Sequence, residues 1–545
     1  MNVYSVIIFI TGAATLALEL LASRIMTPYF GVSLYIWTGI LSITLISLAL
    51  GYFFGGKISH RFNSHSEREF GFLVMPAASA ISLGIASLVY PWAFFQLAQI
   101  NLVVGSFVAC VILLFVPLVT ISAMNPLLVS LRNNFDVTPE KRGDSGSGLV
   151  FFISTTGSVI GVWVTAFLFI PNITNFKSVL ILGFTLASVS MSMCLRSSNL
   201  TGIGKKFLLL TALSGMLLCG SLLAFSARYL HKDEAILYNG YYWKIDKEYT
   251  SLFGNTKILS VAKNHPHDRE HTANPEMSYK LYFQDGILQD LVDQNGISQD
   301  IYSYAMEALG ATDISRNSRI LVLGLAGGIV PMSLAKDGIN VDVVEINPSA
   351  VIAAQEFFDF DPQQVTLYQM DARNYVNQCR WSYNRIIVDL FQGDGIPDYL
   401  LSRNFFHDLK NCISADGAIV LNTFAVPKLM PVFYYLLKTI KSEFEQLYMF
   451  HDDFSNPDET MGVYLVAGNK AYQPRLRLAM QKVPPHLQEQ LRRIFSGARD
   501  IDGNLLRESS VITDEYNIFP ILNVDNYLTY RKTAIHAVPY QFLVN

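Results

Sequence analysis

A glycine-rich turn and an acidic residue beyond it have the types and spacing of a nucleoside-binding site. Residues 320–331, with the sequence ILVLGLAGGIVP, predict a buried strand, a tight turn at Gly324, Gly327 and Gly328, and the start of a helix. Glycine lets a backbone approach a ligand closely, and a helix N-terminus offers free N–H groups and a positive dipole. Glu345 ends the next predicted strand, where its carboxylate can accept the hydroxyls of a ribose.

Two more acids follow later strands of the same region. Asp371 comes after the third predicted strand, where it can accept the exocyclic amine of an adenine. Asp389 ends the fourth strand, above the crevice in which such sheets bind ligands. The alternative is that these residues are ordinary turn glycines and helix-capping acids. Their order at successive strand ends favours a binding site.

The glycine turn also narrows the choice of cofactor. Its spacing is not the Gly-x-Gly-x-x-Gly of dinucleotide-binding turns, and no phosphate-binding lysine follows it. An adenosine that carries a sulfonium suits an acidic site, so we expect S-adenosylmethionine or its decarboxylated form. We expect no metal, because His265, His267 and His271 lack the spacing of a usual metal site and lie in a polar segment that we interpret as a solvated loop.

A parallel sheet would bring these strand ends together. Short apolar segments alternate with helical patterns from residue 300 onward, which predicts a doubly wound α/β sheet. We expect the segment 461–469 to form a late antiparallel edge strand, and the segments 256–263 and 278–292 to form a small β-hairpin region. The predicted parallel strands are 320–324, 341–345, 365–368, 385–389 and 418–421.

The N-terminal part has the composition of a membrane protein. Hydrophobic residues make up 51% of the whole chain and charged residues only 15%. Segments of this length and composition can cross roughly 30 Å of hydrocarbon, where only helices satisfy the backbone. Prolines 76, 91, 117 and 126 predict kinks or a broken helix. The apolar stretches lie near 3–22, 33–55, 70–90, 103–129, 149–170, 177–195 and 206–226.

We therefore expect an α-helical transmembrane bundle of about seven spans, followed by a small β region and a doubly wound, methyltransferase-like (Rossmann-type) α/β domain. The expected boundaries are 1–228 for the bundle, 229–298 for the linker and β-hairpin region, and 299–545 for the cofactor-binding domain.

Charge is divided unequally between these parts. The chain has a net charge of −4, with a positive N-terminal part and a negative C-terminal part. An acidic domain repels phosphate backbones, so we expect no nucleic acid as a partner and a cationic small molecule instead.

The charges of the loops and the supply of the cofactor predict opposite sides of the membrane for the C-terminal domain. The connections near 56–69, 131–148 and 196–206 carry three Lys or Arg residues each. With seven spans, the positive-inside rule would place the C-terminal domain outside. A cytosolic cofactor requires the other orientation. We expect a multi-pass protein of the inner (cytoplasmic) membrane with its catalytic domain on the cytoplasmic side.

Three other features of the sequence lie outside the predicted site: a charged pair, a basic segment and the cysteines. Glu19 and Arg24 in the first apolar stretch are either an ion or substrate site within the bundle or an interfacial pair. The basic, amphipathic segment 475–495 fits an exposed helix pair better than a membrane-surface helix. The five cysteines have no CxxC spacing, so we interpret all of them as reduced or small apolar residues.

The glycine turn and the segments around it resemble a known family. Residues 319–358 and 389–422 closely resemble the spermidine/spermine synthase family of aminopropyltransferases. Residues 12–61 resemble the membrane region of the branch that fuses such a domain to a multi-span bundle. The resemblance implies attack of an amine on the methylene beside the sulfonium of decarboxylated S-adenosylmethionine, with Asp389 as the base.

The resemblance also assigns residues that lie outside the parallel strands. The Asp-Gly-x-x-Gln pattern that lies along the substrate cleft in the family is present as Asp285, Gly286 and Gln289. We expect Gln289 to contact the cofactor. We expect Asp285 and Tyr302 to contact the acceptor.

Two of the acids that bind a diamine in the family are missing or displaced. The second acid of the Asp-x-x-Asp pattern is replaced by Gln392, with Asp394 two residues later, and we expect both to line the acceptor site. The Tyr-x-Glu pattern appears as Tyr302-Ser303-Tyr304, with the nearest acid at Glu307. Loss of a desolvated carboxylate costs a dication several kcal/mol, which argues against putrescine.

Three functions follow. The first is aminopropyl transfer to a small cationic amine or other small-molecule acceptor. The second is methyl transfer from S-adenosylmethionine to a membrane-delivered substrate. The third is a transporter or channel with a non-catalytic polyamine or nucleoside sensor domain. We expect the lipid bilayer and a second copy of the chain, in a dimer, as further partners.

Overall fold

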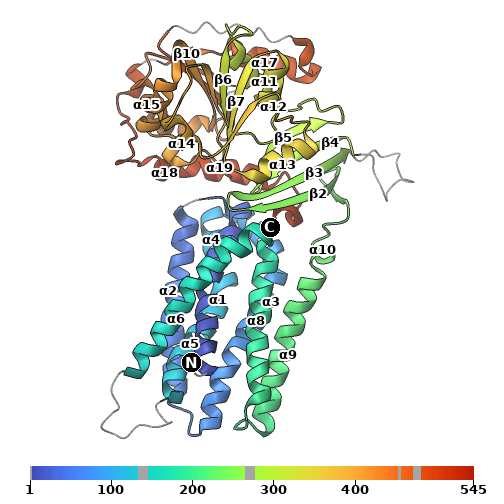
Figure 1. Cartoon of the computed structure of the whole chain (residues 1–545), viewed down its shortest axis with the longest axis vertical. Helices are drawn as coiled ribbons and strands as arrows, with labels where there is room; N and C mark the ends of the chain where they lie inside the picture. Colours follow the sequence, from blue (N-terminus) through green and yellow to red (C-terminus); the bar gives the residue numbers. More distant parts are fainter. Residues whose placement is uncertain are drawn as a thin grey trace, which may run out of the picture. The chain divides into compact units, whose positions relative to one another are not determined.

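The chain divides into two compact units. The computed structural model describes residues 3–32, 34–132, 145–263, 277–451, 456–470, 480–501 and 503–545. One unit comprises Met1–Glu234 together with Val538–Asn545, and the other comprises Ala235–Ala537 (Figure 1). The predicted β-hairpin region and α/β domain therefore share one unit. The C-terminal residues group with the helices, because the Asn545 side chain donates to the Arg24 carbonyl at 2.9 Å.

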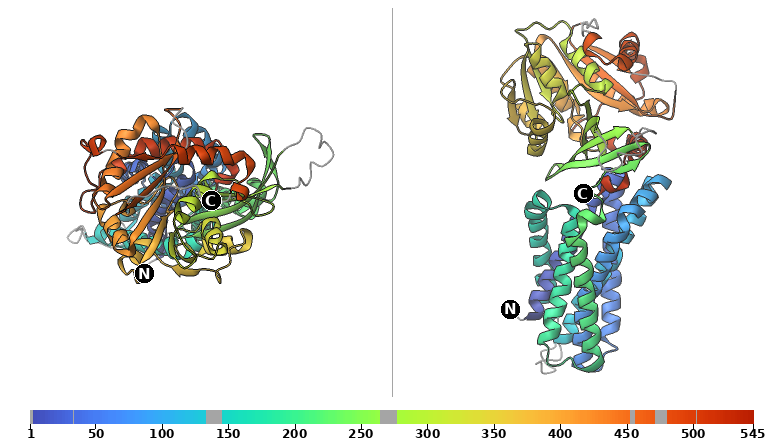
Figure 2. Two further views of the ribbon diagram at one scale, coloured as in Figure 1. Left: turned by 90° about the horizontal axis from the view of Figure 1, so that it is seen from above. Right: turned by 90° about the vertical axis from the view of Figure 1, so that its right-hand side faces the viewer.

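The first unit is built from long apolar helices that run alongside one another (Figure 2). Within the described ranges, seven helical segments are long and apolar enough to cross a membrane, as the sequence predicted. Its α-helices are α1 (Val3–Phe30), α2 (Leu34–Ser59), α3 (His65–Ile100), α4 (Leu102–Cys110), α5 (Val116–Arg132), α6 (Ser145–Val164), α7 (Ile170–Asn172), α8 (Asn175–Arg196), α9 (Gly202–Ala224) and α10 (Ser226–Tyr229).

Small residues let α1 and α6 pack backbone to backbone. A Cβ added at Gly12 would lie 2.2 Å from the Ser154 carbonyl oxygen, and one at Gly161 would lie 2.3 Å from the Ala13 carbonyl oxygen. Close approach through small residues is the usual way that helices associate in lipid.

One of the predicted interruptions is present in the helices. Helix α3 runs unbroken across Pro76 and Pro91. A π-helical turn, Val111–Phe115, separates α4 from α5 and ends just before Pro117. The interruption therefore lies beside one of the four prolines.

The second unit contains a small antiparallel sheet. Among the described residues its strand order is β1-β2-β3-β4-β5. Strands β3, β4 and β5 occupy the segments predicted to form a hairpin region. Strand β2 was not predicted, because its charged residues Lys244, Asp246, Lys247 and Glu248 made the segment resemble a polar linker. The strands are β1 (Ile236–Tyr238), β2 (Tyr241–Ser251), β3 (Gly254–Lys263), β4 (Tyr279–Gln284) and β5 (Ile287–Asp293).

The larger sheet confirms the doubly wound, Rossmann-type prediction. Among the described residues its order is β13-β11-β12-β10-β9-β6-β7-β8. The strands from β8 to β10 pair in parallel, and β12 pairs antiparallel with both β10 and β11. The strands are β6 (Arg319–Leu323), β7 (Asn340–Glu345), β8 (Thr366–Gln369), β9 (Tyr383–Val388), β10 (Ile413–Ala425), β11 (Gln446–His451), β12 (Met461–Gly468) and β13 (Arg499–Asp500).

The prediction of an edge strand at 461–469 was wrong in position. Strand β12 is antiparallel, as expected, but it lies between β10 and β11. The unpredicted strands β11 and β13 continue the sheet beyond it. Because β12 is buried along nearly its whole length, its continuous apolar sequence fits an interior strand.

Helices cover both faces of this sheet, with α14 and α15 on one side and α11, α12 and α17 on the other (Figure 1). Alternate residues of β6 serve the two faces: Leu321 and Leu323 belong to one core, and Ile320 and Val322 belong to the other. The helices are α11 (Ile301–Ala311), α12 (Ile329–Lys336), α13 (Pro348–Phe357), α14 (Ala372–Asn377), α15 (Arg403–Cys412), α16 (Met430–Lys441), α17 (Pro485–Ser496), α18 (Phe519–Leu522) and α19 (Val524–Ile535).

Helix α17 belongs to the amphipathic segment 475–495. Leu487, Leu491 and Ile494 on its apolar face are buried in the core of the sheet domain. This part of the segment is therefore a domain helix. Residues 471–479 and the histidine-rich segment 264–276 lie outside the described residues.

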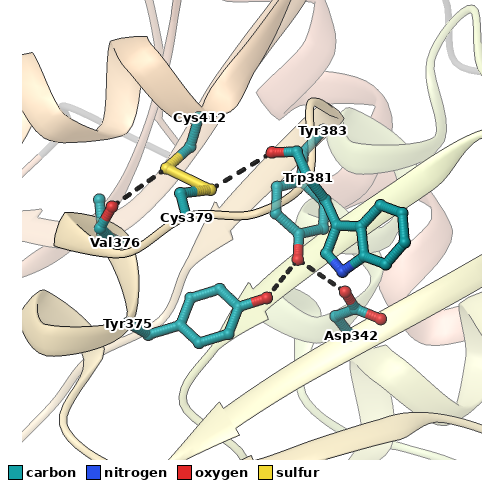
Figure 3. Close-up of a disulfide and its surroundings, with 7 residues drawn as sticks. All are labelled: Asp342, Tyr375, Val376, Cys379, Trp381, Tyr383 and Cys412. Carbon is teal, nitrogen blue, oxygen red and sulfur yellow. Dashed lines mark hydrogen bonds between the residues drawn. A yellow bond between two sulfur atoms is a disulfide. The ribbon is translucent and has the colours of Figure 1, made fainter.

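The prediction that all five cysteines are reduced was wrong for two of them. Cys379 and Cys412 form a disulfide with a Cα–Cα distance of 5.8 Å (Figure 3). Cys110, Cys194 and Cys219 are free and buried. The two bonded cysteines are 33 residues apart, one after α14 and one at the end of α15. Only the folded domain brings them together, so their spacing carried no signal.

Candidate active site

A pocket of about 270 Å³ lies where the parallel strands of the larger sheet end. Strands β9, β6, β7 and β8 are neighbours in that order, so their carboxyl ends form one row. Ligands bind at this edge in doubly wound folds. The predicted site residues that line the pocket are Gln289, Gly324, Glu345, Asp371, Asp389 and Gln392.

Gly324 stands at the centre of this row, directly after β6. Its φ is +97°, and an added Cβ would lie 2.1 Å from the Asp389 carbonyl oxygen. Both the conformation and the close approach require glycine. Gly327 and Gly328 follow in the turn that leads into α12 and do not line the pocket.

Glu345 joins the glycine turn to the end of β7. One oxygen of its carboxylate accepts the Leu325 N–H at 2.9 Å, and the other accepts the Asn347 N–H at 2.7 Å. Burial raises the pKa of Glu345 to about 7, against the effect of these backbone N–H groups. A carboxylate oxygen can accept more than one hydrogen bond, so Glu345 keeps acceptor capacity for ligand hydroxyls.

Asp371 both caps a helix and lines the pocket. Its Oδ1 accepts the Asn374 N–H at 2.9 Å at the start of α14, and its Oδ2 accepts the Tyr399 hydroxyl at 2.8 Å. The helix-capping alternative therefore describes one of its roles, while its position at the end of β8 places it in the pocket wall.

Asp389 follows β9 and is held by the neighbouring strand. Its Oδ1 accepts a hydrogen bond from the Asn422 side-chain amide at 2.9 Å. Burial raises the pKa of Asp389 to about 6, and the Asn422 donor opposes that rise. A carboxylate with a pKa near neutrality is suited to proton transfer at physiological pH.

Three of the predicted acceptor residues lie outside the pocket wall. Asp285 begins the two-residue β4–β5 turn, and its carboxylate accepts the Asn255 N–H at 2.9 Å. Asp394 is buried and forms an ion pair with Arg531 of α19. The Tyr302 hydroxyl donates to a neighbouring acid.

That neighbouring acid, Asp290, was missed in the sequence. Its side chain is 1% exposed, and it accepts the Tyr302 hydroxyl at 2.5 Å and the Gly327 N–H at 2.7 Å. Burial raises the pKa of Asp290 to about 8. Asp290 shares a face of β5 with the buried residue Val292, and a carboxylate that alternates with apolar residues was the available signal.

Part of the second unit matches a known protein domain. Residues 299–452 match the Spermine/spermidine synthase domain. The C-terminal part of the chain carries a spermine/spermidine synthase domain. The match confirms the resemblance drawn from the glycine turn and the Asp389 segment.

Two curated relatives are similar to this synthase domain. A polyamine aminopropyltransferase of Vibrio vulnificus is 36% identical over 138 residues, which cover 24% of this chain and 45% of the relative. An N-terminal histidine N-methyltransferase of Emericella nidulans is 32% identical over 120 residues, which cover 21% of each chain. The chain therefore spans less than half the length of either relative.

A solved structure is also similar. The crystal structure of a probable spermidine synthase from Corynebacterium glutamicum aligns with a TM-score of 0.39 and 16% identity, covering 49% of this chain and 96% of that one.

Proposed function

We propose that the synthase domain transfers an aminopropyl group from decarboxylated S-adenosylmethionine to an amine. The observation that carries the proposal is the partly buried carboxylate of Asp389 at the end of β9, in one pocket with Gly324, Glu345 and Asp371. The match of residues 299–452 to the Spermine/spermidine synthase domain supports the same reaction.

The pocket residues fit the adenosine part of such a donor. Glu345 would accept the ribose hydroxyls, and Asp371 would accept the adenine amine at the far end of the row of strand ends. Gly324 lets the turn after β6 pack closely against the next strand end, because a side chain there would collide with the Asp389 carbonyl. The negative charge of these acids suits a sulfonium.

Asp389 would act on the acceptor. The donor supplies an electrophilic methylene beside its sulfonium. A bond forms between the amine nitrogen and this carbon as the carbon–sulfur bond breaks, and the proton released from the nitrogen goes to Asp389. With a pKa of about 6, Asp389 is ionised at pH 7 and can both orient the amine and take its proton.

We further propose that the seven apolar helices anchor this domain in the inner membrane as a multi-pass protein. Their length and composition support spanning. We propose the cytoplasmic side for the synthase domain because its donor is cytosolic.

Methyl transfer is the second candidate function. It is favoured by the similarity to a histidine N-methyltransferase over 120 residues. The same pocket would then hold S-adenosylmethionine, and the acceptor would be a membrane-delivered substrate.

Product identification separates the two reactions. The purified full-length protein is incubated with each donor and a panel of amines, and the nucleoside product is identified by mass spectrometry. Methylthioadenosine that appears only with the decarboxylated donor and an amine supports aminopropyl transfer. S-adenosylhomocysteine in place of methylthioadenosine would establish methyl transfer and overturn the first proposal.

A further inference from the structure

The row of strand ends separates the donor side of the pocket from the acceptor side. Glu345 and Asp371 stand at the ends of β7 and β8, and Asp389 stands at the other end of the row, after β9. The pocket continues beyond Asp389 along the loop that carries Phe391 and Gln392 and along the small sheet. This continuation is the space left for an acceptor.

The acidic residues of the pocket are already divided between the two sides. Among the described residues that line it, the acids are Glu345, Asp371 and Asp389. The first two hold backbone and tyrosine donors on the nucleoside side. Asp389 is therefore the acid that faces an acceptor from the pocket wall.

Two other acids near the acceptor side already have partners. Asp394 is 4% exposed and forms an ion pair with Arg531, whose side chain has no exposed surface. Arg531 also donates to the Asp285 carbonyl at 2.9 Å. The protein thus supplies its own cation to Asp394. Asp290 is 1% exposed, and both of its carboxylate oxygens accept hydrogen bonds from Tyr302 and Gly327.

Apart from Asp389, the polar residues that line the acceptor side of the pocket are neutral. Gln284, Gln289 and Gln392 are among the residues that line it, and the Gln284 amide also donates to the Phe253 carbonyl at 3.4 Å. An amide both donates and accepts hydrogen bonds, so it can pair with a hydroxyl or another amide, whereas it leaves an ammonium without a counter-charge. Phe253 and Phe391 add apolar surface for an alkyl chain.

We infer that the acceptor is a primary amine with a single ammonium group and a neutral, hydrogen-bonding far end, such as an amino alcohol, rather than a diamine. The inference rests on the proposed function. The ammonium lies against Asp389, and the far end lies among the glutamine amides.

Three acceptors of nearly equal length test this specificity. Putrescine carries an ammonium at the far end, 4-aminobutan-1-ol carries a hydroxyl, and pentylamine carries a methyl group. Methylthioadenosine release by the full-length protein is measured with each. We expect kcat/KM for the amino alcohol to exceed that for putrescine by about tenfold or more, because the second ammonium would lose its hydration without gaining a carboxylate.

A charge added to the acceptor side should reverse the preference. Gln392 is exposed, so Gln392→Asp is expected to fold, and it should raise the putrescine-to-amino-alcohol ratio about two- to fivefold, the effect of an ion pair that water screens. Gln363→Asp adds the same charge at an exposed position outside the pocket and should leave the ratio unchanged.

The possible failures are distinguishable. Methylthioadenosine release with putrescine as the best acceptor of the unaltered protein would overturn this inference and leave the proposed function intact. An unchanged ratio in Gln392→Asp would remove Gln392 from the acceptor site and contradict the inference as well. No methylthioadenosine with any amine would overturn the proposed function and the inference together.

Discussion

Asp389 carries the proposed chemistry, and two opposing effects set its ionisation. Burial favours the neutral acid, and the Asn422 amide favours the carboxylate. A base must be unprotonated, so activity should fall as the pH drops through about 6. Asp389→Asn should lower kcat by about 100-fold or more without abolishing donor binding.

Replacing Asn422 by leucine removes the donor and should raise the pKa of Asp389 further. We expect the acidic limb of the kcat/KM profile to move upward by about one pH unit, since a hydrogen bond to a charged group contributes about 1.5 kcal/mol or more. The profile is measured between pH 5 and 8 with the same acceptor for both proteins. If the acidic limb of the kcat/KM profile lies at the same pH in both proteins, a group other than Asp389 controls the rate.

Asp290 makes the stability of the synthase domain depend on pH. Its folded pKa of about 8 lies above that of an unfolded aspartate, so the folded state binds the extra proton between about pH 4 and 8. The stability due to this group is complete below pH 4 and is lost as the pH rises through 8. Asp290→Asn should weaken this loss, measured by hydrogen exchange of β6 and β9 at pH 6 and 9.

Exposed Glu508 provides the control for this prediction. Glu508→Gln removes a carboxylate of the same domain without changing its interior, so its exchange rates should follow those of the unaltered protein. Equal pH dependence in Asp290→Asn and the unaltered protein would exclude Asp290 as the titrating group.

At the scale of elements, the turn after β6 requires glycine at position 324 for two reasons, its backbone conformation and its close approach to the next strand end. Gly324 has a positive φ and packs against the Asp389 carbonyl, whereas Gly338 has a φ of +82° and an added Cβ there would meet only Arg316 at 3.8 Å. Both alanine variants should lose about 1 kcal/mol from the left-handed conformation. Gly324→Ala should additionally abolish methylthioadenosine binding, measured by calorimetry. Equal binding by both variants would contradict the close approach at Gly324.

The strands around the site could be predicted where a local pattern of apolar residues marks them. Buried parallel strands are short apolar runs, so the strand ends that carry Gly324, Glu345 and Asp389 could be predicted from the sequence. Strands β2 and β11 were not predicted. The charged residues of β2 resemble those of a linker, and β11 is a short apolar run that forms a strand through its pairing with β12.

Contacts between distant segments left no local signal. The ion pair of Asp394 with Arg531 and the disulfide of Cys379 with Cys412 join residues far apart in the sequence. The position of β12 within the sheet likewise depends on β11 beyond it. Asp290 is an intermediate case, since its place between buried apolar residues of one strand is visible in the sequence but its partners are not.

For the molecule as a whole, the proposed function predicts that the synthase domain lies on the cytoplasmic side of the membrane. Two other observations favour the opposite side. The basic connection at 196–206 is separated from the synthase domain by the single long helix α9, so the positive-inside rule places the domain outside. Disulfides such as Cys379–Cys412 persist mainly in oxidising compartments. The proposed donor is cytosolic, and we expect a reporter fused after residue 545 to be active in the cytoplasm.

A reporter that is active only outside would contradict the cytoplasmic assignment. It would also mean that the synthase domain acts on an exported nucleoside. A second reporter fused within the basic connection at 196–206 serves as the control, because α9 spans the membrane only if the two reporters behave oppositely.

The central claim is that an adenosine thioether or sulfonium binds between the glycine turn and Glu345. Calorimetric titration of the full-length protein with methylthioadenosine at pH 8 tests it most directly. We predict saturable binding that is weakened about 10- to 100-fold in Glu345→Gln, because the ribose hydroxyls would lose a charged acceptor. Absence of binding heat, or equal affinity in the variant, would contradict the account.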